Sequence, residues 1–306
     1  MPKKFDVIGL GTSTLDILSL VDHFPAGEEV QQAAAVMLEG GGPAATAMVT
    51  LARLGAATAL LDAIGDDWRG DFIRTRLRKE GVRVDYLRVI PNRTSSTASV
   101  LVRQRDGARA IIFAPGTRES LSPDDVPVEL ITSTRFLHVH GRHWQACLHA
   151  CRVARANSVQ VSFDGGAHHY QPAMRQLVPL TDICVVARPF AEQYTGASEM
   201  ETAGRTLLAE GPQIVAITDG LNGSWVFSRD GESFHQPAFA MPEVVDTTGC
   251  GDSYHGAFLY GLAQGWSLRE TAALAAAVAA LNTQALGGRA GLPTLEQAVA
   301  FLQDRR

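Results

Sequence analysis

Short apolar runs alternate with segments of helical period along most of this chain of 306 residues. The runs have the length of buried strands and lie at residues 5–10, 58–64, 134–139, 159–163, 183–186 and 213–217. Alternation of this kind is typical of a parallel sheet that is connected and covered by crossover helices. The sequence therefore predicts an α/β fold, a parallel-sheet sandwich with helices on both faces.

Start and stop signals mark several of the predicted helices. Pro43 and Gly55 bracket an apolar helical face, as expected for a first helical position and for a residue beyond the last one. Residues 68–80, followed by Gly81, repeat this pattern. Capping-box pairs stand at Ser267 with Glu270, ahead of an Ala-rich segment that runs towards Leu286, and at Thr294 with Gln297.

Two extended segments interrupt the alternation. Residues 97–103 and 109–113, joined at Asp106-Gly107, predict a β-hairpin, and residues 30–38 could add another extended piece. We interpret them as a small β lid, with lid segments at about 17–40 and 94–115. Because no linker, repeat or composition break divides the chain, residues 1–306 are expected to form one domain.

The composition narrows the classes of partner and compartment. With 27 Lys and Arg against 32 Asp and Glu, the net charge is −5, so no general basic surface for nucleic acid is expected. Neither a signal peptide nor an apolar run of about 18 residues is present, so we expect no membrane contact. Four cysteines are too few for a disulfide scaffold, and the i, i+4 pair Cys147 and Cys151 is interpreted as small helix-face residues. A cytoplasmic protein is therefore expected.

Residues 245–252 form the segment with the clearest chemistry. Gly249 and Gly251 lie in a glycine-rich turn that opens a helix, where backbone N–H groups and the helix dipole favour an anion. Asp252 falls in the first turn of that helix, as a base next to a phosphoryl group would. Asp252 could instead only cap the helix, but Asp246 and the two glycines favour the anion site.

This segment, Asp-Thr-Thr-Gly-Cys-Gly-Asp at 246–252, resembles the second signature of the PfkB, or ribokinase-like, family of carbohydrate and nucleoside kinases. The first signature is also present, in the stretches 40–55, 64–70 and 81–82, and residues 9–16 extend the likeness over nearly the whole chain. Two signatures in the right order and spacing are specific, whereas either glycine run alone would be weak. The resemblance implies a ribokinase-like fold.

The resemblance also implies a role for each matching position. Asp252 would be the base that takes the proton of the substrate hydroxyl, and the amides of Gly249, Cys250 and Gly251 would stabilise charge on the γ-phosphoryl of ATP. Asp16, Gly41 and Gly42 would hold sugar hydroxyls. The nucleotide would contact Thr218, Gly220 and Gly223 through its phosphates and Ala277, Ala280, Leu281 and Gly287 through its adenine. The implied cofactors are ATP and Mg²⁺.

Three positions depart from the family pattern. Cys250 replaces the usual Ala, and Thr46 stands where the family usually has a sugar-binding Asn. Residues 187–190, Ala-Arg-Pro-Phe, replace the Asn-x-x-Glu motif, so how Mg²⁺ is held stays open.

Local likeness to the branch that phosphorylates 6-deoxy-6-sulfofructose appears at 40–47, 235–239 and 287–291. By that likeness Arg142, after the predicted strand 134–139, could pair with an anionic substrate group; a solvated loop residue is the alternative. Glu28 and Glu29, in place of the branch's usual Lys, weigh against an anionic substrate.

Other functions were compared with the kinase hypothesis. His138 and His140 share one strand face and could bind a metal, although a buried, hydrogen-bonded strand end is the commoner arrangement. Residues 9–14 resemble a dinucleotide-binding fingerprint, but Thr14 occupies the position of its third glycine, which argues against a hydride-transfer enzyme. Asp252 argues against an inactive sugar-binding relative, and no P-loop run occurs.

We therefore expect transfer of the γ-phosphoryl of ATP to a hydroxyl of a small sugar, of ketohexose, sulfo-sugar or pentose type. A nucleoside kinase or an inactive sugar-binding relative is the alternative. Apolar Val100, Ile111 and Phe113 in the lid would leave an exposed face on a single copy, which favours a homodimer through the lid.

Overall fold

The computed structural model describes residues 3–117, 119–167 and 169–305, and its centre is a nine-stranded sheet. In spatial order its strands are β13 (Ser233–Gln236), β12 (Ser224–Ser228), β11 (Ile214–Thr218), β10 (Ile183–Ala187), β9 (Gln160–Gly165), β8 (Thr134–Val139), β1 (Phe5–Leu10), β4 (Thr58–Gly65) and β5 (Leu87–Ile90). Strands β5 to β11 of this order are parallel, as the alternating pattern predicted. The pairing of β12 with β11 and with β13 is antiparallel, because short turns join these three strands.

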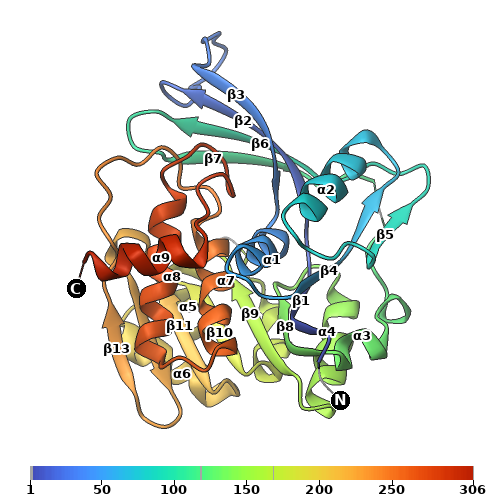
Figure 1. Cartoon of the computed structure of the whole chain (residues 1–306), viewed down its shortest axis with the longest axis vertical. Helices are drawn as coiled ribbons and strands as arrows, with labels where there is room; N and C mark the ends of the chain where they lie inside the picture. Colours follow the sequence, from blue (N-terminus) through green and yellow to red (C-terminus); the bar gives the residue numbers. More distant parts are fainter. Residues whose placement is uncertain (1–2, 118, 168, 306) are drawn as a thin grey trace.

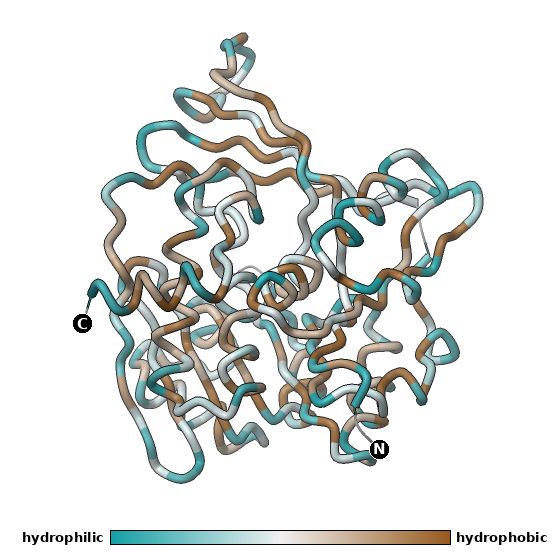
Figure 2. Tube along the Cα trace, viewed as in Figure 1, coloured by the Kyte–Doolittle hydropathy of each residue, from teal (hydrophilic) through white to brown (hydrophobic). Residues whose placement is uncertain are grey.

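Helices pack on both faces of this sheet (Figure 1). One face carries α1 (Pro43–Arg53), α7 (Cys250–Ala263) and α8 (Leu268–Asn282), with α9 (Leu295–Gln303) against α8; the other carries α3 (Val128–Thr132), α4 (Trp144–Ala156), α5 (Arg188–Thr195) and α6 (Met200–Glu210). Successive residues of a strand point to opposite faces of the sheet. Val7 belongs to the hydrophobic core on the side of α1, α7 and α8, and Ile8 belongs to the core on the side of α3 to α6. Hydrophobic residues therefore follow the central strands (Figure 2).

A second sheet of four strands projects beyond the first one (Figure 1), and we call it the lid. Its order is β3 (Ala35–Gly41), β2 (Thr14–Val21), β6 (Thr97–Arg103) and β7 (Arg109–Ala114). The predicted hairpin is confirmed, since β6 and β7 are antiparallel. The extended piece expected at 30–38 begins only at Ala35, and β2 was not predicted as a strand. Helix α2 (Trp68–Lys79) packs between the lid and β4.

Helix ends follow the local signals, with one exception. Pro43 opens α1, and both capping boxes form at α8 and α9. Helix α8 stops at Asn282 instead of continuing towards Leu286. The amide group of Asn282 donates hydrogen bonds to the carbonyls of Thr248 (3.3 Å) and Gly288 (3.0 Å), so a tertiary contact ends this helix. Short 3-10 turns occur at η1 (Pro123–Asp125), η2 (Pro172–Gln176), η3 (Val178–Leu180) and η4 (Gly220–Asn222).

Membrane-spanning helices and the state of the Cys147 and Cys151 pair were both addressed by expectations from the composition. Within residues 3–117, 119–167 and 169–305, no helix has both the length and the apolar character needed to cross a membrane. Cys147 and Cys151 are buried and unbridged on α4, which agrees with their interpretation as small helix-face residues.

Candidate active site

A cleft of about 640 Å³ lies where the lid, the carboxyl ends of the central strands and the start of α7 meet. Ligands of open α/β folds bind at this edge of the sheet. Its walls include several residues singled out from the sequence, namely Asp16, Gly42, Arg142, Thr218, Gly249, Gly251 and Asp252. Segments far apart in the chain therefore contribute to one site.

The glycine turn at the start of α7 forms part of the cleft floor. Gly249 is the N-cap residue with φ of +72°, and a Cβ there would lie 2.5 Å from the carbonyl oxygen of Gly288. Only glycine tolerates both the left-handed backbone and this close approach. A Cβ on Gly251 would meet open space, and Cys250 is the first residue of the helix. Because first-turn amides lack intrahelical acceptors, this end of α7 can bind an anion.

Asp252 is half-buried in that first turn. Burial in the cleft raises the pKa of its carboxyl to about 6, and the negative charge of Asp164 adds to the rise. His255, Arg109 and His169 act in the opposite direction. A carboxylate whose pKa lies near neutrality is suited to accept a proton at physiological pH.

Arg109 is a cleft residue that the sequence analysis did not identify. It is the first residue of β7, and its Nη1 donates a hydrogen bond to Oγ1 of Thr247 at 3.0 Å, just before the glycine turn. Alternation along the hairpin could have revealed it, because Arg109, Ile111 and Phe113 all line the cleft, whereas Ile112 is 71% exposed. The lid thus brings a cation to the anion-binding end of the cleft.

Asp16, on β2, also lines the cleft. Burial raises the pKa of Asp16 to about 6, against the effects of a hydrogen bond from Thr14 and the charge of Arg289. Thr14 donates that bond from Oγ1 to Oδ1 at 2.5 Å. A Cβ on Gly41 would collide with the Asp16 carboxylate, so the glycine makes room for it. The carboxylate of Asp16 is suited to accept hydrogen bonds from hydroxyl groups.

Thr46 and Arg289 lie behind this part of the cleft. Thr46 is buried, and its hydroxyl accepts a hydrogen bond from Nε of Arg289 at 3.1 Å. Arg289, itself buried, also donates from Nη2 to the carbonyl of Gly41 at 2.6 Å. Neither Thr46 nor Gly41 is among the residues that line the cleft. Arg289 was not identified from the sequence as a site residue, although it lies within the stretch 287–291.

Arg142 lies on the cleft wall, beyond the end of β8. The turn at Gly141 has φ of +83°, and the backbone N–H of Arg142 donates to Nδ1 of His140 at 3.4 Å. Its side chain is half-buried rather than fully solvated. This is the position in which it could meet a substrate group.

The residues expected to bind nucleotide lie in two regions, the segment at the end of β11 and the helix α8 with the loop after it. Thr218, at the end of β11, lines the cleft, while Gly220 begins the turn η4 and Gly223 follows it, both with positive φ. Ala277 and Ala280 are buried on α8 with Phe301, and Leu281 packs against them. The N–H of Gly287 donates to Oδ2 of Asp246 at 2.8 Å, which ties this loop to the segment before the glycine turn.

The residues at the end of β10 do not fit a protein-held Mg²⁺. Ala187 has no side-chain oxygen, and Phe190 is buried against Phe163. Arg188 forms ion pairs with Glu192 (2.8 Å) and Asp219 (3.1 Å), so both carboxylates are engaged. Among the described residues, no group of three or more His, Cys, Asp and Glu could hold a metal ion.

The two strand histidines have pKa values well below their ordinary range. Burial lowers the pKa of His138 to about 3 and that of His140 to about 4. His138 contacts Oγ of Ser162 through Nδ1 at 3.2 Å, which is the buried, hydrogen-bonded arrangement considered as the alternative to a metal site.

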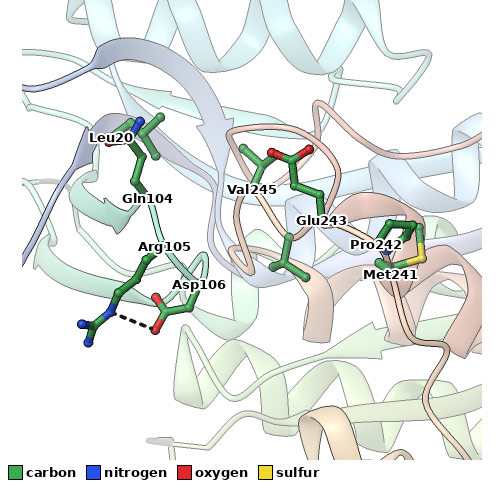
Figure 3. Close-up of a pocket in the computed structure, with 9 residues that line it drawn as sticks. Leu20, Gln104, Arg105, Asp106, Met241, Pro242, Glu243 and Val245 are labelled. Atoms are coloured by element: carbon green, nitrogen blue, oxygen red, sulfur yellow. Dashed lines mark ion pairs between the residues drawn. The ribbon is translucent and has the colours of Figure 1, made fainter.

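Figure 3 shows a second cavity, of about 570 Å³, between the turn of the lid hairpin and residues 241–245. Arg105 and Asp106 lie on one side, with Nε and Oδ2 3.7 Å apart, and Met241 and Glu243 lie on the other. None of the residues expected from the sequence to act in catalysis or to bind substrate or nucleotide lines this cavity, so the first cleft is the candidate active site.

Known proteins resemble the chain over almost its whole length. The model of the pfkB family carbohydrate kinases matches residues 4–295. An uncharacterized sugar kinase from Archaeoglobus fulgidus is 31% identical, over 79% of this chain and 98% of that protein. A 5-dehydro-2-deoxygluconokinase from Shouchella clausii is 26% identical, over 99% and 97%. The structure of Arabidopsis thaliana ribokinase complexed with ribose and ATP has a TM-score of 0.84 at 24% identity, covers 99% of each chain and shows the same fold. Together with the glycine turn and the cleft, these similarities establish that the chain belongs to the pfkB family of carbohydrate kinases and is a phosphotransferase.

Proposed function

We propose that this kinase transfers the γ-phosphoryl of ATP to a hydroxyl of a small sugar, with Asp252 as the general base. One observation carries the proposal: Asp252 and the glycine turn of α7 share a single cleft with Asp16, under the lid. A base, an anion-binding helix end and a hydroxyl-binding carboxylate are the parts that phosphoryl transfer to an alcohol requires.

In this reaction Asp252 accepts the proton as the sugar oxygen bonds to the γ-phosphorus and the bond to the β-phosphate oxygen breaks, which releases ADP. The amides at Gly249, Cys250 and Gly251 and the guanidinium of Arg109 would stabilise charge on the transferred group. Asp16 would orient the sugar. Mg²⁺ would enter as part of the nucleotide substrate, since phosphates and waters supply most of its ligands.

For the substrate we propose a ketohexose, sulfo-sugar or pentose, and Arg142 supports an anionic member of this group. The relative named 5-dehydro-2-deoxygluconokinase acts by its name on an acidic sugar derivative, which agrees with a cation on the cleft wall. A coupled assay of ADP release over neutral sugars, acidic sugars, sulfo-sugars and nucleosides tests the class. Release with nucleosides alone would contradict the sugar assignment.

Asp252→Asn tests the base. We expect turnover on the best sugar to fall by about 10²–10⁴, because proton transfer in the transition state is lost, while nucleotide binding changes little. Steady-state kinetics and nucleotide titration measure the two effects. Asp304→Asn, which changes an exposed carboxylate at the end of α9, is the matched control. Wild-type turnover in Asp252→Asn would show that another group is the base.

We also propose a homodimer through the lid, by a face other than the one first expected. Of the residues first expected on that face, Val100 is buried, whereas Ile111 and Phe113 are 51% and 46% exposed and line the cleft. Val36, Leu38 and Ile112 are the exposed apolar residues of the opposite face, at 65%, 45% and 71% exposure. Pairing two lids by this face would remove these side chains from water.

The cytoplasmic location and the single-domain organisation stay predictions.

A further inference from the structure

A buried histidine and carboxylate lie behind the base, and the mechanism above does not use them. His255 stands one turn after Asp252 on α7, and its Nε2 lies 3.1 Å from Oδ1 of Asp164 on β9. Their side chains are only 6% and 3% exposed, yet both residues line the cleft together with Asp252. Charged side chains are rarely buried this deeply unless they are paired.

The pair is ionic. Burial alone would lower the pKa of His255, but the charges of Asp164 and Asp252 and the hydrogen bond to Asp164 outweigh it and raise the pKa. In the same way, His255 holds the pKa of Asp164 below its usual range despite burial. These shifts favour an imidazolium at His255 beside the carboxyl groups of Asp164 and Asp252, which line the same cleft.

Other charged or titratable groups surround these three from neighbouring elements. They are His138 and His140 on β8, His169 after β9, Arg109 on β7 of the lid, and Arg289 after α8. The ring of His138 packs against that of His255, with centroids 5.8 Å apart. Because the pKa of His138 is lowered to about 3, this ring is neutral and supplies no charge to the wall.

We propose that His255, held by Asp164, is a positioning residue that keeps Asp252 ionised for proton abstraction. The inference rests on the proposed function, in which Asp252 is the base. Without the imidazolium, Asp164 and Asp252 would be two carboxylates on one buried wall, and one of them would retain a proton. With it, both stay ionised near neutral pH.

The pH dependence of kcat/KM tests this, because its acidic limb reports the base of the free enzyme. We expect His255→Asn to move the limb up by about one pH unit from about 6, so that kcat/KM falls about fivefold at pH 6 and hardly at pH 8. The control His138→Asn removes a neutral ring and should leave the limb in place.

A purely structural role would lower kcat/KM at every pH without moving the limb, and that result in His255→Asn would overturn the proposal. If His255→Asn does not fold, nitrogen NMR of the wild-type His255 ring gives a second measurement. Protonation of both ring nitrogens at pH 6.5 supports the proposal, and a neutral ring contradicts it. Asp252→Asn, assayed in parallel, separates the two hypotheses: retained turnover removes the base assignment, whereas lost turnover with an unmoved limb in His255→Asn removes only the role of His255.

Discussion

The pKa values of two carboxyl groups that line the cleft are raised by the same cause. Burial raises the pKa of Asp252 and of Asp16 to about 6 in each case. Such a shift has an energetic consequence, because an ionised group that is buried for function opposes folding. We therefore expect that ionised Asp16 and Asp252 lower the free energy of unfolding at neutral pH.

Asp16→Asn tests this expectation. Because the folded pKa of Asp16 lies above its unfolded value, the stability that the group contributes is present below pH 4 and is lost as pH rises through about 6. We expect the variant to be more stable than wild type by at most about 3 kcal/mol at pH 7, with little difference at pH 4. Sugar affinity should fall. Urea unfolding at both pH values measures the difference, and an equal effect at the two would contradict the argument.

Arg142→Ala tests the charge of the substrate. Loss of a charge-assisted contact should lower the transition-state stabilisation, measured from the ratio of kcat/KM values, by about 1.5–3 kcal/mol for an anionic sugar and change it little for the neutral parent sugar. Arg78→Ala, which removes an exposed arginine of α2, is the control. Equal losses on both sugars, or none on either, would count against an anion-binding role.

At the scale of elements, buried polar links join the segments that carry the cleft. Asp62 on β4 accepts hydrogen bonds from the backbone N–H and the hydroxyl of Ser13, at 2.7 and 2.6 Å. Nε2 of His143 lies 2.7 Å from the other oxygen of Asp62. Nδ1 of His143 accepts the N–H of Leu121 at 3.0 Å, so Nε2 carries the proton. The start of α4 is thereby held to β4 and to the chain just before β2.

His143→Ala should destabilise the fold by about 1.5–3 kcal/mol, since it removes a hydrogen bond to the buried Asp62. His143 has φ of +56°, so His143→Gly, which loses the same ring but tolerates this backbone, should be the more stable of the two variants by about 1 kcal/mol. Thermal unfolding ranks them. If His143→Ala is as stable as wild type, the link contributes nothing.

At the scale of the whole molecule, one face of the lid lines the cleft and the other face points away from it. Leu38, Ile17, Ser99 and Ile112 lie in one cross-strand row on the outer face, while the neighbouring row of Asp16, Ala98 and Phe113 faces the cleft. A lid that dimerises by the outer row leaves the inner row free for substrate.

Ile112→Lys should therefore convert a dimer into a monomer, because a charge would be buried in the paired face. Phe113→Ser, one residue away on the cleft face, should leave the dimer intact and change sugar kinetics instead. Light scattering at micromolar concentration measures the mass. A wild-type monomer under these conditions would exclude dimerisation through the lid.

Local signals in the sequence determined most of the elements. The strand runs, the capping boxes and the hairpin at Asp106-Gly107 depend on hydrophobic period, caps and turn residues, which act over a few neighbouring positions. The glycine turn before Asp252 was visible for the same reason, since it is contiguous. Strand β2 and the early end of α8 were not, because the pairing of β2 with β6 and the bonds of Asn282 to distant carbonyls form only in the folded chain.

Only the tertiary structure decided which side chains meet. Arg109, Asp164, His255 and Arg289 come from four separate segments, and no spacing in the sequence relates them. Thr46 matches a sugar-binding position, but Arg289, 243 residues later in the chain, engages its hydroxyl. The physical reason is that burial, charge pairing and access to the cleft depend on distances through space, which the order of residues along the chain does not specify.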